Sequence, residues 1–199
     1  HAMEPEKGRN AAVLLAKFLK TELERGVGAE FVRFVTDVFD GDHTGATLGF
    51  NYYDEMSGET TLNPGIVTFN EKGGAIEVSM RYSVTYPFDE KMTAVQARMA
   101  ETPFILDVAG DSKPHYVPED DELVQTLLSV YQKHTNDFSK VLSTGGGTYA
   151  RVLKKGVAFG MLYPGELDVA HQADEFVVVD NLLKAAAIYA EAIVKLASK

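Results

Sequence analysis

The 199-residue sequence contains no cysteine, which excludes disulfide bonds, thiolate metal sites and cysteine nucleophiles. It also contains no apolar run of about 18 residues, so it predicts no membrane-spanning helix. Lys and Arg form no stripe with interleaved aromatic residues, and a formal net charge of -10 repels phosphate backbones. We therefore expect no nucleic-acid or membrane partner, and the acidic composition indicates a soluble, cytoplasmic protein.

Several common catalytic motifs are also missing. The sequence has no HExxH motif and no His-x-Asp pair, and its glycine-rich segment lacks the Lys-Ser/Thr of a phosphate-binding loop. No serine lies in a nucleophile elbow. The residues alone therefore give no complete reaction centre.

The first half of the chain changes from a helical to a strand-like pattern. Apolar spacing of three and four residues predicts amphipathic helices over residues 8–25 and 31–39. From residue 47 the period is two, which predicts strands over residues 47–53, 65–70 and 75–84. A helix over 89–101 and a short strand over 104–108 follow. The expected apolar faces are Ala11, Leu14, Leu15, Phe18, Leu19 and Leu23, then Phe31, Phe34, Val35 and Val38, then Ile76, Val78, Met80, Tyr82 and Val84.

The order of these elements predicts an α+β layer with helices on one face of an antiparallel sheet. Breaker residues at 110–114 mark a candidate domain boundary. Beyond it we expect a helix over 120–134, a buried strand over 156–162 and a last helix that Asp180 caps. The second part has too few strands for a sheet of its own, so it should expose apolar surface unless another chain covers it.

Three features are candidates for chemistry, and each has an ordinary structural alternative. His171, in a polar loop, could be a metal ligand or a surface residue. Gly145, Gly146 and Gly147 could let backbone N–H groups approach an anion, or simply form a tight turn. Arg81, on the polar face of a strand, could bind a carboxylate through two N–H bonds, or pair with a neighbour such as Glu77.

A set of short motifs resembles those of the PepV-type dipeptidases. This group belongs to the dinuclear zinc peptidases, which also include aminoacylases, carnosinases and succinyl-diaminopimelate desuccinylases. The resemblance covers nearly the whole chain. It rests on residues 1–11 (HAxxPxxGxNA), 78–82 (VSMRY), 113–118 (KPHYVP), 143–151 (STGGGTYAR), 156–160 (GVAFG), 163–165 (YPG), 171–172 (HQ) and 180–190 (DNLLKAAAIYA).

The resemblance implies a role for each candidate residue. His1 would stabilise the oxyanion of the tetrahedral intermediate, and Arg81 would hold the substrate carboxylate. The backbone around Gly145, Gly146 and Gly147 would line the same pocket. His171 would be a ligand to one of two zinc ions, for which manganese or cobalt are alternatives. The chemistry implied is metal-assisted hydrolysis of a dipeptide with a free N-terminus.

The resemblance also implies an α/β fold in two parts. Residues 1–112 would form most of a lid domain, incomplete at its N-terminus, and residues 113–199 the C-terminal segment of an α/β catalytic domain. The remaining metal ligands and the general base would lie in a missing N-terminal half. We therefore expect this chain to need that half as its partner and to be inactive alone.

Two other functions remain open at this point. Related enzymes remove acyl or succinyl groups from amines, and a non-catalytic module that assembles through lid-like sheets is the alternative outside the enzymes. Single-lid relatives dimerise through their lids, whereas an enlarged lid implies a monomeric full-length protein.

Overall fold

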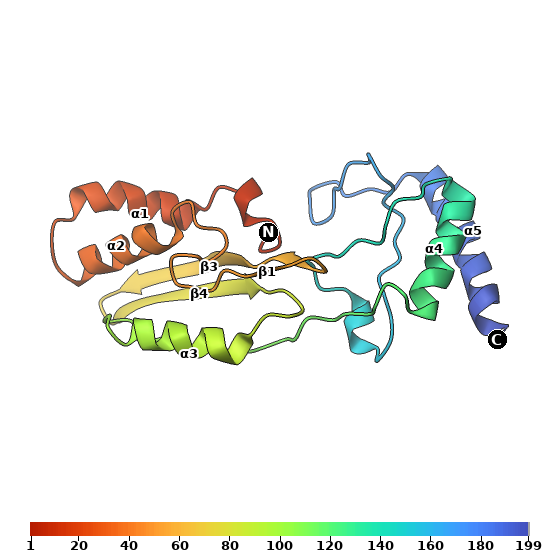
Figure 1. Cartoon of the computed structure of the whole chain (residues 1–199). Coiled ribbons are helices and arrows are strands. Elements are labelled where there is room, and N and C mark those ends of the chain that lie inside the picture. Colours follow the sequence, from red (N-terminus) through yellow and green to blue (C-terminus); the bar gives the residue numbers. More distant parts are fainter. Residues whose placement is uncertain (199) are drawn as a thin grey trace. The chain divides into compact units, whose positions relative to one another are not determined.

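Residues 1–198 are described by the computed structural model, which combines α-helices with small antiparallel sheets (Figure 1). The chain divides into two units. The first comprises residues 1–114 and 143–146, and the second comprises residues 115–142 and the C-terminal part from Gly147. The identification of these parts with a lid and a catalytic domain stays a prediction.

The first unit contains three α-helices, a short 3-10 helix and two pairs of antiparallel strands. In chain order these are η1 (Pro5–Lys7), α1 (Ala11–Glu22), α2 (Val27–Phe39), β1 (Tyr53–Asp54), β2 (Gly58–Glu59), β3 (Thr61–Asn70), β4 (Gly73–Arg81) and α3 (Phe88–Met99). Strand β1 pairs with β2, and β3 pairs with β4 in a longer hairpin.

The β3–β4 hairpin places apolar residues on one face. Leu62 lies opposite Met80 and Val67 opposite Ile76, with an irregularity between Pro64 and Ile66 that keeps these pairs on the same side. All four contribute to the apolar cluster of this unit. The predicted alternation along β4 is thus confirmed for Ile76 and Met80.

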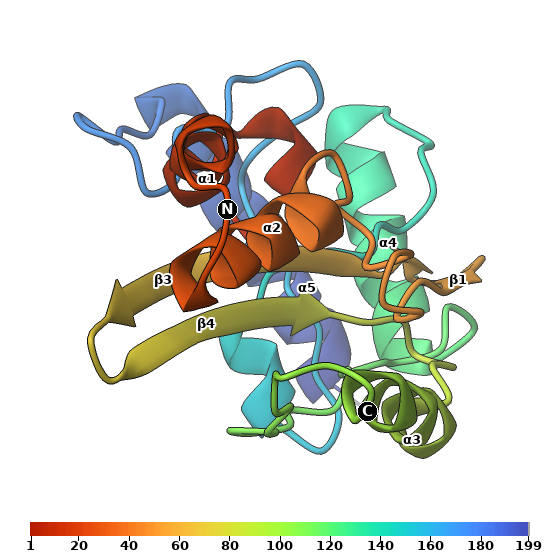
Figure 2. The same ribbon diagram turned by 90° about the vertical axis from the view of Figure 1, so that its left-hand side faces the viewer.

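Helix α2 supplies much of this apolar core. Phe31, Val35 and Val38 are buried, with Val35 only 1% exposed, and Phe34 packs against them. The face predicted for this helix is confirmed. Figure 2 shows α2 crossing the hairpin, and its Phe31 ring lies so close to Gly74 that a Cβ there would be 2.3 Å from a ring carbon. Gly74 therefore allows the helix to approach the strand.

Three expectations for this unit are wrong. In α1 the buried residues are Val13 and Ala16, whereas Leu14, Leu15 and Phe18 are exposed, Phe18 by 63%. Residues 47–53 form turns and coil, and only Tyr53 belongs to a strand. Residues 104–108 form no strand either, although Phe104 and Leu106 pack against the core as an extended segment would. Strand character needs a hydrogen-bonding neighbour, which these segments do not have among the described residues.

The second unit is built on two helices, α4 (Glu122–Thr135) and α5 (Val179–Ala197), with η2 (Tyr149–Val152) between them. Asp121 caps α4 by accepting a hydrogen bond from the backbone N–H of Leu123. Val130 of α4 packs against Ile188 and Ala192 of α5. The helix predicted over residues 120–134 is therefore confirmed to within two residues at each end.

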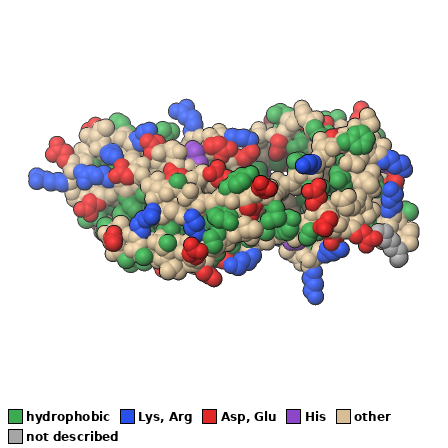
Figure 3. Space-filling view, in the orientation of Figure 1, with side chains coloured by type: hydrophobic (Ala, Val, Ile, Leu, Met, Phe, Trp, Pro, Cys, Tyr) green, Lys and Arg blue, Asp and Glu red, His purple; other side chains and the backbone are tan. Residues whose placement is uncertain are grey.

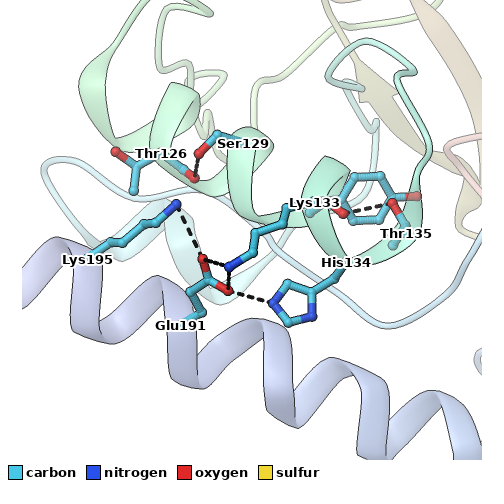
Figure 4. A network of polar contacts seen from close by, with 8 residues as sticks. Thr126, Ser129, Lys133, His134, Thr135, Glu191 and Lys195 are labelled. Atoms are coloured by element: carbon cyan, nitrogen blue, oxygen red, sulfur yellow. Dashed lines mark hydrogen bonds and ion pairs between the residues drawn. The ribbon is translucent and has the colours of Figure 1, made fainter.

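Charged side chains join the same two helices at their surface. Glu191 of α5 accepts hydrogen bonds from Lys133 and His134 of α4 and pairs with Lys195 one turn on (Figure 4). The bonds from Lys133, then that from His134, hold the pKa of Glu191 at about 2. The bond to Glu191 gives His134 a structural role at the contact between α4 and α5.

Two expectations for the second unit are also wrong. Residues 156–162 form no strand, although Phe159 packs against the α4–α5 contact. Helix α5 begins at Val179 with Val178 as its N-cap, so Asp180 lies in the first turn and interacts with the helix dipole instead. Many apolar side chains of this unit are exposed, and Figure 3 shows apolar side chains open to solvent between charged ones.

Within residues 1–198, no helix has the length and hydrophobicity needed to cross a lipid bilayer.

Candidate functional site

The N-terminal segment is fixed to the hairpin by Asn10, the N-cap of α1. Its side-chain oxygen accepts hydrogen bonds from the backbone N–H groups of Ala12 and Val13. Its side-chain nitrogen donates to the carbonyl oxygen of Pro64 at 2.9 Å. One amide thereby caps the helix and ties its start to β3.

Residues before this cap lie against the start of β3. The Thr61 hydroxyl donates to the carbonyl oxygen of Ala2 at 2.7 Å. The backbone N–H of Met3 donates to the Nδ1 atom of His1 at 3.3 Å. His1 is exposed, and the Ala2 carbonyl that follows it is held to the start of β3.

Arg81 lies directly across the hairpin from Thr61. It is half-buried, and its buried Nε atom has no hydrogen-bond partner among the described residues. The neighbouring Tyr82 donates to the carboxylate of Asp111; burial, and then this bond, raise the pKa of the Tyr82 hydroxyl. Buried donors are normally satisfied, so the unpaired Nε is compatible with an anionic ligand beside Arg81.

The glycine segment is divided between the two units. Gly145 and Gly146 belong to the first unit and lie next to the Met3 side chain. The hydroxyl of the preceding residue, Thr144, lies 3.2 Å from the Met3 sulfur. Gly147 belongs to the second unit, where the Arg151 side chain lies next to it. Within the first unit, Gly145 and Gly146 therefore lie next to Met3, two residues after His1.

His171 lies in the second unit, in an exposed loop before α5. Its backbone has a φ of 64°, and its N–H donates to the Glu175 carboxylate at 3.2 Å. Residues 1–198 contain no group of three or more His, Asp or Glu side chains placed to hold a metal ion. Because zinc centres use about three or four protein ligands, the residues present do not make a complete zinc site.

A loop that the motifs did not single out is held together by several hydrogen bonds to one carboxylate. The Asp42 carboxylate accepts from the backbone N–H groups of residues 44–47. Burial alone would raise the pKa of Asp42, but these bonds, led by that from Thr47, lower it to about 2. The Asp-x-Thr-Gly sequence, typical of a side-chain-capped turn, is the signal that could have found it.

His43 lies in this loop, and its carbonyl oxygen accepts a hydrogen bond from the Leu62 N–H at 2.7 Å. An open depression of about 620 Å³ lies beside it, lined among others by Glu6, His43 and Glu59. A second depression, of about 700 Å³, lies around Tyr116 in the second unit. Neither is lined by a predicted site residue. The Nε2–H of His115 donates to the Gly156 carbonyl oxygen at 2.6 Å, which gives His115 a structural role.

Known proteins resemble this chain along nearly all of its length. The protein named "Putative dipeptidase YtjP" from Bacillus subtilis (strain 168) is 46% identical over 199 residues, 99% of this chain. "Putative dipeptidase SSP1012" from Staphylococcus saprophyticus is 34% identical over 98% of the chain, and a "Putative dipeptidase" from Staphylococcus epidermidis is 34% identical over 97%. The chain spans only 41% to 42% of the length of these relatives.

The family resemblance expected from the motifs is thus confirmed at the level of the whole chain. The model of peptidase family M20/M25/M40 matches residues 10–195, which includes all elements from α1 to most of α5. The chain therefore belongs to peptidase family M20/M25/M40.

Proposed function

We propose that this chain is part of a zinc-dependent, cytoplasmic dipeptidase that hydrolyses dipeptides with a free N-terminus. Membership of the peptidase family supports hydrolysis of an amide bond. The names of the relatives, which align with nearly the whole chain, support a dipeptide as the substrate.

One observation carries the proposal at the level of the site. At one end of the β3–β4 hairpin, Thr61 bonds to the residue after His1 and lies opposite Arg81. Gly145 and Gly146 contact Met3 in the same unit. An imidazole and a guanidinium with an unpaired N–H are among the groups that a substrate with a carbonyl and a carboxylate requires.

In this proposal the developing oxyanion and the C-terminal carboxylate of the substrate are each bound by a different hydrogen-bond donor. His1 donates to the oxygen that becomes negative as the peptide carbonyl is attacked. Arg81 pairs with the C-terminal carboxylate, and the backbone of Gly145, Gly146 and Gly147 lines that end of the pocket. A fixed carboxylate orients the scissile bond, which lowers the entropic cost of the reaction.

We assign His171 as one zinc ligand. A neutral imidazole is a common zinc donor, but the chain supplies no further clustered ligands within residues 1–198. The other ligands and the general base would come from the part of the full-length protein that this chain does not span, and manganese or cobalt could replace zinc. The full-length protein, with an enlarged lid, is expected to be a monomer.

The test compares the full-length protein with the 199-residue chain on a dipeptide such as Ala-His. We expect zinc-dependent hydrolysis by the full-length protein and none by the chain alone, because one histidine cannot hold a zinc pair. Faster cleavage of N-acyl or N-succinyl amino acids would instead identify a deacylase. Inactivity on all of these substrates would favour an assembly module.

Arg81 provides the sharper test of the site. In the full-length protein, Arg81→Ala should raise KM for Ala-His by ~10- to 100-fold, since a charge-assisted hydrogen bond is lost. The effect should shrink for a dipeptide with an amidated C-terminus. Arg98→Ala is the matched control, because this arginine is exposed and its side chain donates to the backbone carbonyl oxygen of Thr47. Equal effects of the two substitutions would exclude the assigned role.

A further inference from the structure

Met3 contacts two segments that are far apart in the sequence. Its backbone N–H donates to Nδ1 of His1, two residues before it. Its side chain lies against the segment Thr144–Gly146, some 140 positions later, with the sulfur 3.2 Å from the Thr144 hydroxyl oxygen. All these residues belong to the first unit. Met3 is therefore the direct link between His1 and the glycine segment.

The backbone contact has a consequence for the chemistry of His1. A neutral imidazole carries one proton, on either Nδ1 or Nε2. If Nδ1 accepts the Met3 N–H, the proton is on Nε2, and Nε2–H becomes a hydrogen-bond donor. A donor directed at a developing negative oxygen stabilises it, whereas the opposite tautomer would present a lone pair to it.

The side-chain contact explains why a glycine is needed at position 145. A Cβ on Gly145 would lie 2.8 Å from Cγ of Met3, and one on Gly146 would lie 3.6 Å from the Met3 sulfur. The first distance is too short for two carbon atoms, so an alanine at 145 would displace either Met3 or the glycine segment. The backbone before Met3 is separately held, because the Ala2 carbonyl oxygen accepts from Thr61.

We propose that Met3 is a positioning residue, which holds the proton of the His1 imidazole on Nε2 through its N–H and sets the distance between His1 and the glycine segment through its side chain. The inference rests on the proposed function, because it assigns Met3 to the same site. Met3 itself touches neither the substrate nor the metal in this arrangement.

A double-mutant cycle in the full-length protein tests the side-chain contact. Gly145→Ala should lower kcat/KM for Ala-His by ~10- to 100-fold, since misplacement by about 1 Å has effects of this size. Met3→Ala should lower it by only ~3- to 10-fold. The double variant should lie within ~3-fold of Met3→Ala alone, because removal of the long side chain makes room for the new Cβ. Independent, multiplying effects would overturn the inference.

A second pair of variants tests the backbone contact. Met3→Leu keeps the N–H and most of the side-chain volume, whereas Met3→Pro removes the N–H. We expect Met3→Leu to keep kcat within ~3-fold and Met3→Pro to lower kcat by ~10-fold or more with little change in KM, since the donor acts on the developing charge. Equal kinetics of the two variants would contradict the role of the N–H.

The imidazole can also be observed without any activity. Nitrogen-15 NMR of the full-length protein should show His1 protonated on Nε2 in the wild type and in Met3→Leu, and a mixture of tautomers in Met3→Pro. A wild-type His1 protonated on Nδ1 would overturn the inference even if the enzyme is active. Absence of dipeptidase activity together with the expected tautomer would instead disprove the proposed function and leave this contact intact.

Discussion

At the scale of single residues, one carboxylate organises a whole loop of the first unit. Asp42 accepts hydrogen bonds from four successive backbone N–H groups, and the loop that it closes holds Leu62 through the carbonyl oxygen of His43. Leu62 is a buried member of the apolar core. The charge of Asp42 is therefore coupled to the packing of the hairpin.

This coupling predicts a specific dependence on pH. Asp42 has a pKa of about 2 in the fold, below the ordinary value of 3.8, so its charge stabilises the folded state above about pH 4. That stabilisation is lost as the pH falls from 4 towards 2. The Asp42→Asn variant should be less stable than the wild type at pH 7, and the difference should narrow over this window. Urea unfolding at several pH values measures it.

The control for this experiment is Asp107→Asn, which changes an exposed aspartate of the same unit. Its unfolding midpoints should follow those of the wild type at each pH. Asp54, which accepts bonds from Ser57 and Thr85, also has a pKa of about 2 and will keep part of the acid sensitivity in every variant. A wild type and an Asp42→Asn variant with parallel acid curves would contradict the assignment.

At the scale of secondary-structure elements, what the sequence predicts depends on whether an element is complete within its own segment. The spacing of apolar residues located α2 and α4, since a helix satisfies its hydrogen bonds internally. It predicted strands at residues 104–108 and 156–162 that the structure does not contain. A strand requires a hydrogen-bonded neighbour, which a local pattern does not reveal. In α1 the pattern gave the helix, but its widest apolar face is not the face that the fold buries.

In strand β4, the protection of each backbone amide depends on whether it faces the neighbouring strand β3. On β3, the N–H of Leu62 points away from β4 to His43, and the carbonyl of Pro64 points away to Asn10. Met80 lies opposite Leu62, and Val78 lies opposite Pro64. In an antiparallel pair such opposite residues both direct their backbone groups away from each other, so the groups of Met80 and Val78 point to the outer edge of β4. No third strand within residues 1–198 pairs with that edge.

We therefore expect alternating amide exchange along β4 in the 199-residue protein. The N–H groups of Val78 and Met80 should exchange faster by ~10-fold or more than those of Glu77 and Ser79, which face β3. Hydrogen–deuterium exchange followed by NMR resolves the individual amides. Uniform protection of all four would mean that the outer edge of β4 is covered in solution and would contradict an open two-stranded sheet.

At the scale of the whole molecule, the candidate site could be predicted only in pieces. Resemblance of motifs named His1, Arg81, Gly145, Gly146, Gly147 and His171, and the family is now shown. Their roles stay predictions. The contacts of Met3 and Thr61 had no sequence signal, because each joins segments that only the fold brings together. A complete zinc site could not be predicted from the sequence either, since residues 1–198 contain no cluster of three or more possible ligands.

The two helices of the second unit leave much apolar surface exposed. On α5 alone, Leu183, Ile193 and Val194 are exposed, Ile193 by 65%, and the chain spans 42% of the length of the Bacillus subtilis relative. We expect the 199-residue protein to bind a hydrophobic dye and to associate at micromolar concentration, whereas the full-length protein should do neither. Dye fluorescence and light scattering measure this.

Two substitutions distinguish exposed apolar surface from loss of structure. Ile193→Glu should reduce association while it leaves the melting temperature nearly unchanged, because most of this side chain is already exposed to solvent. Ile188→Ala, at a buried position of the α4–α5 contact, should destabilise the unit by about 2–4 kcal/mol and increase dye binding. If the 199-residue protein is monomeric and binds no dye, the apolar surface of this unit must be covered within the chain itself, and the separation into two units would have to be abandoned.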